Sequence, residues 1–592
     1  MTQTHEEEIL GKAYDARLMG RLLRYARPYW AQFALAGGLL CAITLLEQAG
    51  PAIVKVAIDR FLSKGRSQGL LSWAALYLAC TLGAFGLQAW QSIQTAFLGQ
   101  TILLDLRMQI FSHLLAQGLR FFDKNPVGRL MTRVIYDVET LDDFFSQGVV
   151  AVFNDFFTLA SVTALLLWFD WRLGLAALAV LPLLSWATAA YRRFARQNYR
   201  QVRTRLARIN AFLGENLSGM ATIQAFLREG VNAGKMDALN AEYRDLLLRQ
   251  IKINAFFLPL AEILSALAVF LVLTYGGWRL HTAGLSVGVI VASAMYVTHF
   301  FQPLRDLSDK YNVLQSSMAS AERIFSLLDR TPEVLDPPSP RPLPRLQGRV
   351  AFEGVWFAYE GEDWVLKDLS FGLAPGERVA VVGPTGAGKT SLVSVLMRFY
   401  PYQKGRVSLD GVPLEELSRG DFRRQVSLVL QDPFLFSGSV LENVRLSNPR
   451  IPPSRVEEAC RQVAADEFIR DLPGGYSSEI GERGGLLSVG QKQLLAFARA
   501  LVFDPRLLIL DEATANVDTA TEERVQKALQ TLLKGRSSIT IAHRLSTVTG
   551  ADRILVLQGG RLTQQGDHRS LMRQGGLYRS LVELQFKQVE RA

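Results

Sequence analysis

Six apolar stretches in the first half of the chain constrain its fold more than any other feature of the sequence. Most of them approach the roughly 20 residues that cross a bilayer as a helix. Six buried helices of a soluble domain are the alternative, but the repeated spanning length favours membrane helices. The stretches lie near residues 33–54, 70–90, 149–169, 173–190, 256–278 and 287–301.

Basic residues flank these stretches and predict how they are oriented. Seven arginines lie from Arg192 to Arg208, and four more lie from Arg17 to Arg27. The positive-inside rule therefore places the N-terminus, the long loops and the second half of the chain in the cytoplasm, beside a cell membrane. The formal net charge of +10 could also suggest nucleic-acid binding. However, no nucleic-acid motif accompanies the arginines, so membrane lipids are the expected partners and nucleic acid is not.

Two further features of the composition exclude other classes of protein. The N-terminus has no basic head followed by a short apolar core, so no cleaved signal peptide is expected. The three cysteines, Cys41, Cys80 and Cys460, have the spacing of neither a metal site nor a disulfide framework.

A proline-rich segment, TPEVLDPPSPRPLPRLQ from residue 331, divides the chain. Such a segment favours a stiff, extended linker. Beyond it, strand-like runs alternate with helical stretches, which indicates an α/β domain with a parallel sheet. The expected organisation is a six-helix transmembrane domain at 1–330, a linker at 331–348 and an α/β domain at 349–592. Residues 91–148 and 191–255 are expected to extend the membrane helices into the cytosol, with turns near 125–128 and 214–219.

A phosphate-binding loop follows the predicted strand RVAVVG. The loop matches G-x-x-x-x-G-K-[ST] in the required strand–loop–helix setting, where backbone N–H groups surround the phosphates and the helix directs its positive end at them. Lys389 is expected to reach the β- and γ-phosphates, and Thr390 to bind Mg²⁺. The nucleotide-binding residues are therefore Gly383, Pro384, Thr385, Gly386, Ala387, Gly388, Lys389, Thr390 and Ser391.

A second apolar strand, LLILDE, ends in two carboxylates. Parallel α/β sheets bind their ligands at the carboxyl ends of the strands. Asp511 is therefore expected to hold Mg²⁺ through water, and Glu512 to orient and deprotonate an attacking water. A charged strand end without function is the alternative, which the phosphate-binding loop makes the weaker one.

These motifs, taken in order, resemble an ATP-binding cassette (ABC) domain. The order is GPTGAGKTS, Gln431 in LVLQDP, LLSVGQKQ, LLILDEATANVD and IAHRLS. With six upstream spans, nearly the whole chain resembles the half-transporters of the multidrug exporter type. FFDKNPVGRLMTR and GENLSGMATIQAF resemble the cytoplasmic loops of that family, whose turns are coupling helices that dock on nucleotide domains, the second on the partner's domain.

The resemblance implies that the ligands are ATP and Mg²⁺, and it assigns further roles. Tyr359 would stack on adenine, although a core aromatic residue is the alternative. Gln431 would contact Mg²⁺ and the attacking water, and His543 would touch the γ-phosphate. Asp518 would bridge two cassettes, and residues 481–484 match an exporter-specific segment.

The signature stretch LLSVGQ departs from the family consensus L-S-G-G-Q at one position, Val489. In this family two cassettes pair head to tail, so Ser488, Val489, Gly490 and Gln491 would face an ATP held by the partner. A β-branched residue restricts the backbone there and crowds its approach. We therefore expect a heterodimer with unequal ATP sites, in which a second half-transporter supplies a standard signature opposite Glu512. A homodimer that tolerates the valine is the alternative.

The function implied by the resemblance is ATP hydrolysis coupled to export of lipophilic or amphipathic compounds by alternating access. Lipid or peptide translocation on the same scaffold, and a regulatory or channel role, are the alternatives. Glu47, Asp155 and Glu262 fall in or near the spans, where they could contact a cationic substrate or bond between helices. Four aromatic residues could line a cavity or pack against other helices: Phe256, Phe257, Tyr296 and Phe300.

Overall fold

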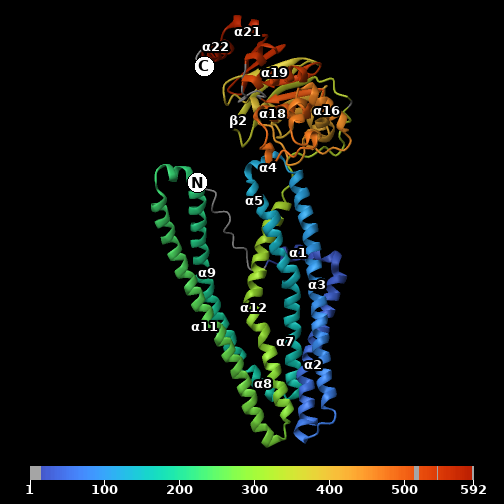
Figure 1. Cartoon of the computed structure of the whole chain (residues 1–592), viewed down its shortest axis with the longest axis vertical. Coiled ribbons are helices and arrows are strands. Elements are labelled where there is room, and N and C mark those ends of the chain that lie inside the picture. Colours follow the sequence, from blue (N-terminus) through green and yellow to red (C-terminus); the bar gives the residue numbers. More distant parts are fainter. Residues whose placement is uncertain (1–14, 344, 512–518, 543–544, 590–592) are drawn as a thin grey trace. The chain divides into compact units, whose positions relative to one another are not determined.

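The protein is described here by a computed structural model that covers residues 15–343, 345–511, 519–542 and 545–589 (Figure 1). Contacts between residues divide the chain into two compact units. The first contains Met1–Leu114 and Val127–Arg330, and the second contains Leu115–Pro126 and Thr331–Ala592. A short segment from the first half of the chain therefore packs with the second unit.

Every regular element of the described part of the first unit is helical. The α-helices are α1 (Ala16–Ala26), α2 (Trp30–Arg60), α3 (Leu70–Ala116), α5 (Val127–Thr132), α6 (Val138–Asp142), α7 (Val149–Phe169), α8 (Trp171–Leu178), α9 (Leu181–Ser218), α10 (Met220–Ala225), α11 (Glu229–Ala283) and α12 (Val287–Leu328). Short 3-10 turns lie at Arg27–Tyr29 and Leu62–Lys64, and π turns at Arg133–Asp137 and Asp143–Gly148.

Five of these helical runs are long and apolar enough to cross a membrane, and a sixth is shorter. The five are Ala16–Lys64, Leu70–Ala116, Val152–Phe169, Trp171–Ser218 and Glu229–Thr282, and the shorter apolar run is Val287–Pro303. Five of the six expected spans therefore each lie in one helix, and the span at 173–190 runs through α8 and α9. The helix is interrupted between α8 and α9, and Pro182 lies in the first turn of α9, a position that proline tolerates.

The long helical extensions expected on either side of the second cytoplasmic turn are confirmed. Figure 1 shows α9 and α11 side by side as a long hairpin, closed by Gly219, α10 and the residues up to Arg228. The first turn is also where it was expected, because α4 (Leu119–Lys124) ends immediately before Asn125 and Pro126.

Helices α2 and α12 are joined by hydrogen bonds at two levels. Pro51 lacks the N–H that would bond one turn back in α2, and Tyr296 donates its hydroxyl to the neighbouring carbonyl of Gln48 at 2.7 Å. At the C-terminal end of α2, Asp59 accepts from the Ser286 hydroxyl at 2.7 Å and from the Gly288 N–H at 2.8 Å. Tyr296 is fully buried, so it packs between helices in this structure rather than lining a cavity.

The other polar residues singled out in the spans differ in their surroundings. Asp155 forms an ion pair with Lys310 and so bonds α7 to α12. The structure therefore favours interhelical bonding as the role of Asp155. Glu47 and Glu262 are exposed on the single chain.

The aromatic residues singled out in the spans also differ from one another. Phe256 is exposed, and Phe257 stacks on Tyr191 with ring centroids 4.1 Å apart. Phe300 is buried in the core of the bundle.

The second unit holds two sheets in its described residues. A six-stranded sheet has the order β10-β9-β3-β8-β7-β6, and a four-stranded antiparallel sheet has the order β2-β1-β4-β5. Their strands are β1 (Val350–Ala358), β2 (Trp364–Leu373), β3 (Arg378–Val382), β4 (Lys404–Leu409), β5 (Val412–Pro413), β6 (Val426–Val429), β7 (Leu507–Asp511), β8 (Ser537–Ile541), β9 (Arg553–Gln558) and β10 (Arg561–Gly566).

Helices surround the larger sheet and build a separate helical core. The α-helices of the second unit are α4 (Leu119–Lys124), α13 (Lys389–Leu396), α14 (Arg419–Gln425), α15 (Val440–Arg445), α16 (Pro453–Gln462), α17 (Asp466–Asp471), α18 (Val489–Val502), α19 (Thr519–Leu533), α20 (Leu545–Thr549), α21 (His568–Gln574) and α22 (Leu577–Val589). Short 3-10 turns lie at Leu414–Glu416, Gly475–Ser477 and Glu482–Gly484. One apolar core joins the two sheets, and another lies among α15, α16, α18 and α19.

The expected parallel sheet is present, with one difference at its edge. Strands β9, β3, β8, β7 and β6 are parallel, whereas β10 runs antiparallel to β9. Gly559 and Gly560 form the tight turn between β9 and β10, both with positive φ (56° and 82°). Two-residue hairpins need such angles, which glycine adopts readily, and a hairpin imposes antiparallel pairing.

The proline-rich linker has no helix in its described residues and is bonded to the second unit. Asp336 accepts from the Arg419 backbone N–H at 3.0 Å and from its Nε at 2.9 Å. The guanidinium of Arg398 donates to the Leu335 carbonyl at 2.8 Å, and the Leu346 N–H donates to the Gln425 side chain at 2.7 Å. The linker is therefore held along the surface of the second unit by specific bonds.

The close contact at Gly288 predicts a stability effect in the membrane half. A Cβ added there would lie 2.5 Å from the Lys55 carbonyl and 2.6 Å from Asp59 Oδ1, whereas one added at Gly277 would meet nothing within 4 Å. Gly288→Ala is therefore expected to destabilise the helical unit by about 1–3 kcal/mol, as overpacking does. Apparent melting temperatures of Gly288→Ala and Gly277→Ala in detergent test this, and equal values would contradict it.

Candidate functional site

The phosphate-binding loop follows the buried strand β3 and is packed too closely for side chains at two of its glycines. A Cβ at Gly388 would lie 2.8 Å from Leu366 Cδ2, and one at Gly383 would lie 2.2 Å from the carbonyl oxygen of Leu557. Gly388 also has a φ of 96°, a conformation that glycine adopts without cost. The loop backbone therefore lies directly against β2 and β9.

Lys389 begins α13 and folds back over this loop. Its Nζ donates to the Gly383 carbonyl at 2.7 Å and to the Pro384 carbonyl at 3.1 Å, and the residue is only 7% exposed. Thr385 and Gly386 are exposed at the tip of the loop. A buried ammonium beside exposed backbone N–H groups at a helix start fits the phosphates of a nucleotide.

The carboxylate site lies at the same edge of the sheet as this loop. Asp511 ends β7, which pairs in parallel with β8, and β8 pairs in parallel with β3. The carboxyl ends of these strands therefore share one edge, where Thr390 and Asp511 could together hold Mg²⁺. Glu512, Asp518 and His543 lie outside the described residues, so their predicted roles remain predictions.

Tyr359 lies in the same core as the phosphate-binding loop. Its hydroxyl is 3.1 Å from Ser391 Oγ, one residue beyond Thr390, and the side chain is half-buried. Its ring meets the edges of Tyr400 and Phe357, with centroids 5.1 Å and 4.8 Å away. Tyr359 is thus a partly exposed aromatic residue beside the loop, a position that suits stacking on adenine as well as packing.

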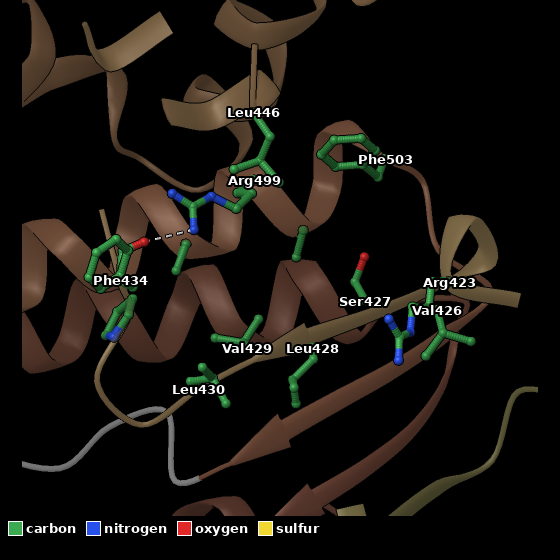
Figure 2. A pocket seen from close by; sticks show the side chains of 13 residues that line it. Arg423, Val426, Ser427, Leu428, Val429, Leu430, Phe434, Leu446, Arg499 and Phe503 are labelled. Carbon is green, nitrogen blue, oxygen red and sulfur yellow. Dashed lines mark hydrogen bonds between the residues drawn. The ribbon is translucent and has the colours of Figure 1, made fainter. Parts of the chain in front are cut away.

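Gln431 follows β6 and is exposed. The next residues are held by Arg499 of α18, whose guanidinium donates to the Phe434 carbonyl at 2.9 Å and to the Asn443 carbonyl at 3.0 Å (Figure 2). Burial lowers the pKa of Arg499 from its ordinary value, and these carbonyl acceptors help to compensate the desolvated charge. Sequence reasoning missed Arg499, because nothing in the motifs showed which residue braces this segment.

A hollow of about 280 Å³ lies beside this segment (Figure 2). Its lining is largely apolar and includes Leu428 and Leu430 on or just after β6, Phe434, Leu446 and Phe503. Leu430, Phe434 and Leu446 are 44–51% exposed on the single chain. Exposed apolar side chains gathered around a hollow are typical of a protein-binding surface.

The signature residues begin α18 and form a reciprocal cap. Ser488 Oγ accepts from the Gln491 N–H at 3.3 Å, and Gln491 Oε1 accepts from the Ser488 N–H at 2.9 Å. Gly490 is buried, whereas Val489 is 47% exposed at the first position of the helix. The signature therefore belongs to the helical core, and the phosphate-binding loop belongs to the core that joins the sheets.

The exporter-type segment before the signature contacts the segment that follows Gln431. A Cβ at Gly484 would lie 2.8 Å from Leu435 Cδ1, and Leu435 is buried. Gly481, Arg483 and Gly484 all have positive φ, so this turn holds a specific shape. Leu435 is a second residue that sequence reasoning missed, since the contact joins segments about 50 residues apart in the chain.

A comparison of two serine residues that cap helices in the same way tests whether Ser488 has a role in ATP turnover besides capping α18. Ser439 caps α15 by the same reciprocal arrangement, with Glu442 in place of Gln491. Ser488→Ala and Ser439→Ala are each expected to lower the stability of the unit by about 1 kcal/mol, the usual value of such a cap. Only Ser488→Ala should also lower ATP turnover at saturating ATP. Equal turnover in both variants would show that Ser488 is a cap alone.

Comparison with known proteins places this geometry in a family. The model of the ABC transporter transmembrane region matches residues 33–304, and the ABC transporter model matches residues 366–515. The chain is 36% identical over 582 residues to YknV, an uncharacterised ABC transporter ATP-binding protein of Bacillus subtilis strain 168, covering 98% of this chain and 96% of the relative.

Two further comparisons extend the match across the whole chain. An ATP-dependent lipid A-core flippase of Syntrophus aciditrophicus is 33% identical over 569 residues, covering 96% of this chain and 94% of the flippase. The structure of a bacterial Atm1-family ABC exporter with ATP bound aligns with a TM-score of 0.78 at 27% identity, covering 96% of this chain and 99% of that one. The chain therefore belongs to the ABC exporter half-transporters, multi-pass membrane proteins that work as dimers and couple ATP hydrolysis by a cytoplasmic domain to transport.

Proposed function

We propose that this chain is one half of an asymmetric heterodimer that exports lipophilic or amphipathic compounds, of the multidrug type, by alternating access. The observation that carries the asymmetry is the position of Val489 at the exposed start of α18. A lipid flippase on the same scaffold is the second candidate, supported by the flippase among the relatives. A peptide exporter and a homodimer are the remaining alternatives.

The valine does not disturb the fold of its own chain. Val489 is the first residue of a regular helix and has no positive φ, so its backbone does not require glycine. Its side chain is 47% exposed, and the cap formed by Ser488 and Gln491 is intact. The valine therefore affects a ligand that binds at this helix start and not the fold of its own chain. In our proposal that ligand is the ATP held by the partner.

The residues for ATP turnover in this chain are proposed to form one of the two ATP sites of the dimer. Lys389 would bind the β- and γ-phosphates, with Thr390, Gln431 and Asp511 holding Mg²⁺, which when bound would neutralise charge on the phosphates. Glu512 would take a proton from the attacking water, and His543 would touch the γ-phosphate. Since these residues are all present, we assign the catalytic base of the active site to this chain, opposite a standard signature on the partner.

The apolar hollow beside Phe434 is proposed to receive the second cytoplasmic turn of the partner. In this chain the second cytoplasmic turn contains α10 and exposes Met220, Phe226 and Leu227, which are 38–83% exposed, and we propose that the partner's turn is similarly apolar. Burying such side chains in an apolar hollow is favourable by roughly 25 cal/mol per Å² of apolar surface removed from water. Because Arg499 of α18 holds the segment that follows Gln431, movement of the bound turn would change the position of Gln431 near the attacking water.

The surroundings of the membrane helices support this substrate class. The helices are apolar, but the ion pair Asp155–Lys310 and the bond from the Thr44 hydroxyl to Asn154 Oδ1 (3.3 Å) place polar groups between α2, α7 and α12. Charged groups inside a membrane usually face a cavity or a partner rather than lipid. A compound with an apolar body and a polar end would suit both kinds of surface, which describes drugs and lipids alike.

The proposed asymmetry predicts how turnover responds to a change at Val489. The chain purified alone in lipid is expected to turn over ATP weakly, and Val489→Gly should raise that turnover by about tenfold, a 1.4 kcal/mol effect on the composite site. Val489→Thr keeps the branched shape and should stay weak. Co-expression with the product of the neighbouring gene should restore turnover, and Glu512→Gln in this chain should abolish it.

Two results would decide against the heterodimer. Strong turnover by the unmodified chain alone, abolished by Glu512→Gln, would mean a homodimer in which the valine is harmless. Turnover with a partner that persists in the Glu512→Gln variant would mean that the catalytic base lies in the other chain.

A further inference from the structure

The first cytoplasmic turn is bonded to the nucleotide-binding unit of its own chain at three places. Tyr400 donates its hydroxyl to Asp123, Lys124 pairs with Glu360 at 2.7 Å, and Arg120 pairs with Glu333 at 3.3 Å. All six residues belong to the second unit, in which the segment Leu115–Pro126 contains α4. The first of these contacts differs from the others because Tyr400 is 7% exposed and part of the core that joins the sheets.

Tyr400 contacts α4 and the proposed adenine platform at the same time. Its hydroxyl reaches Asp123, whereas its ring meets the Tyr359 ring edge-on, with centroids 5.1 Å apart and an interplanar angle of 85°. Burial, together with the bond to the Asp123 carboxylate, raises the pKa of Tyr400. The hydroxyl therefore keeps its proton at neutral pH and remains a donor to α4.

Tyr359 contacts the phosphate-binding helix directly and is connected to α4 through two neighbouring residues. Its hydroxyl is 3.1 Å from Ser391 Oγ in the first turn of α13, two residues after Lys389. The residue after Tyr359 is Glu360, which holds Lys124. Two of the three bonds to α4 are therefore made by residues next to Tyr359: Tyr400, which contacts its ring, and Glu360, which follows it in the chain.

We propose that Tyr400 is a positioning residue that transmits adenine occupancy to the first cytoplasmic turn. In this proposal a base stacked on the partly exposed Tyr359 ring shifts that ring and with it the edge contact to Tyr400. Tyr400 cannot shift without changing its bond to Asp123, because one rigid ring carries both contacts. This inference rests on the proposed role of Tyr359 and adds that the turn responds to the base and not only to the phosphates.

A purely structural role for Tyr400 makes a different prediction. In that case its hydroxyl only satisfies Asp123, and α4 would respond equally to any ligand that fills the phosphate-binding loop. A ligand with phosphates and no base separates the two readings, since tripolyphosphate can reach Lys389 but has nothing to stack on Tyr359.

The test is amide hydrogen exchange of residues 115–126 in the full-length transporter in lipid, with a non-hydrolysable ATP analogue or tripolyphosphate. Each ligand is used at a concentration that protects α13 equally. The analogue is expected to change exchange in α4, and tripolyphosphate is not. In Tyr400→Phe without ligand, exchange in α4 should rise about tenfold, as loss of a hydrogen bond to a charged group implies. The response of α4 to the analogue should then be lost while protection of α13 remains.

Three variants complete the design. Tyr402→Phe is the matched control, because Tyr402 packs on the same core and its hydroxyl accepts from the Val407 N–H at 3.2 Å rather than touching α4. It should keep the response of α4. Asp123→Ala removes the same bond from the other side and should behave like Tyr400→Phe. Tyr359→Ala should weaken binding of the analogue but not of tripolyphosphate.

The outcomes distinguish the proposed role of Tyr400 in the response of α4 from the proposed role of Tyr359 in binding adenine. If Tyr400→Phe and Asp123→Ala both keep the full response of α4 to the analogue, the link through Tyr400 is wrong. If Tyr359→Ala leaves affinity for the analogue unchanged, the adenine platform itself is wrong, and the proposed role of Tyr359 fails first. An equal response of α4 to both ligands in the unmodified protein would also overturn the inference.

Discussion

A peptide group inside hydrocarbon has no solvent with which to hydrogen-bond, and this constraint governs the first half of the chain. It explains why the regular elements in the described residues of that unit are helices. At Pro51 the regular bonding of α2 is interrupted, and the Tyr296 hydroxyl from α12 bonds the adjacent Gln48 carbonyl. Such bonds make the spans into connected bodies, so movement is expected between groups of helices rather than within one.

The nucleotide-binding unit follows a different constraint, which is close backbone packing. The phosphate-binding loop lies so near β2 and β9 that side chains at Gly383 and Gly388 would collide with them. Lys389 is thereby held over the loop by two carbonyls before any phosphate arrives. Preorganisation of this kind lowers the cost of binding, since the loop has little conformational freedom left to lose.

Two side chains of the second unit join elements that lie far apart in the chain. Arg499 braces the segment after Gln431 beside an apolar hollow, and Tyr400 joins α4 to the aromatic residue beside the loop. Tyr400 is buried and Arg499 is partly buried, and each has two partners that lie on different elements. In our proposals these side chains couple their partners, because a shift of one partner would change the contact with the other.

The sequence by itself determined the class of the protein, its spans and its nucleotide motifs, because spanning length and glycine-rich loops are local properties of a chain. It also located Val489, but only the structure showed that this residue starts a helix with its side chain exposed and the cap intact. Likewise, no sequence motif marks Tyr400, Arg499 or Leu435. The ion pair of Asp155 with Lys310 depends on the packing of α7 against α12. These roles depend on contacts between residues far apart in the chain, which no local pattern specifies.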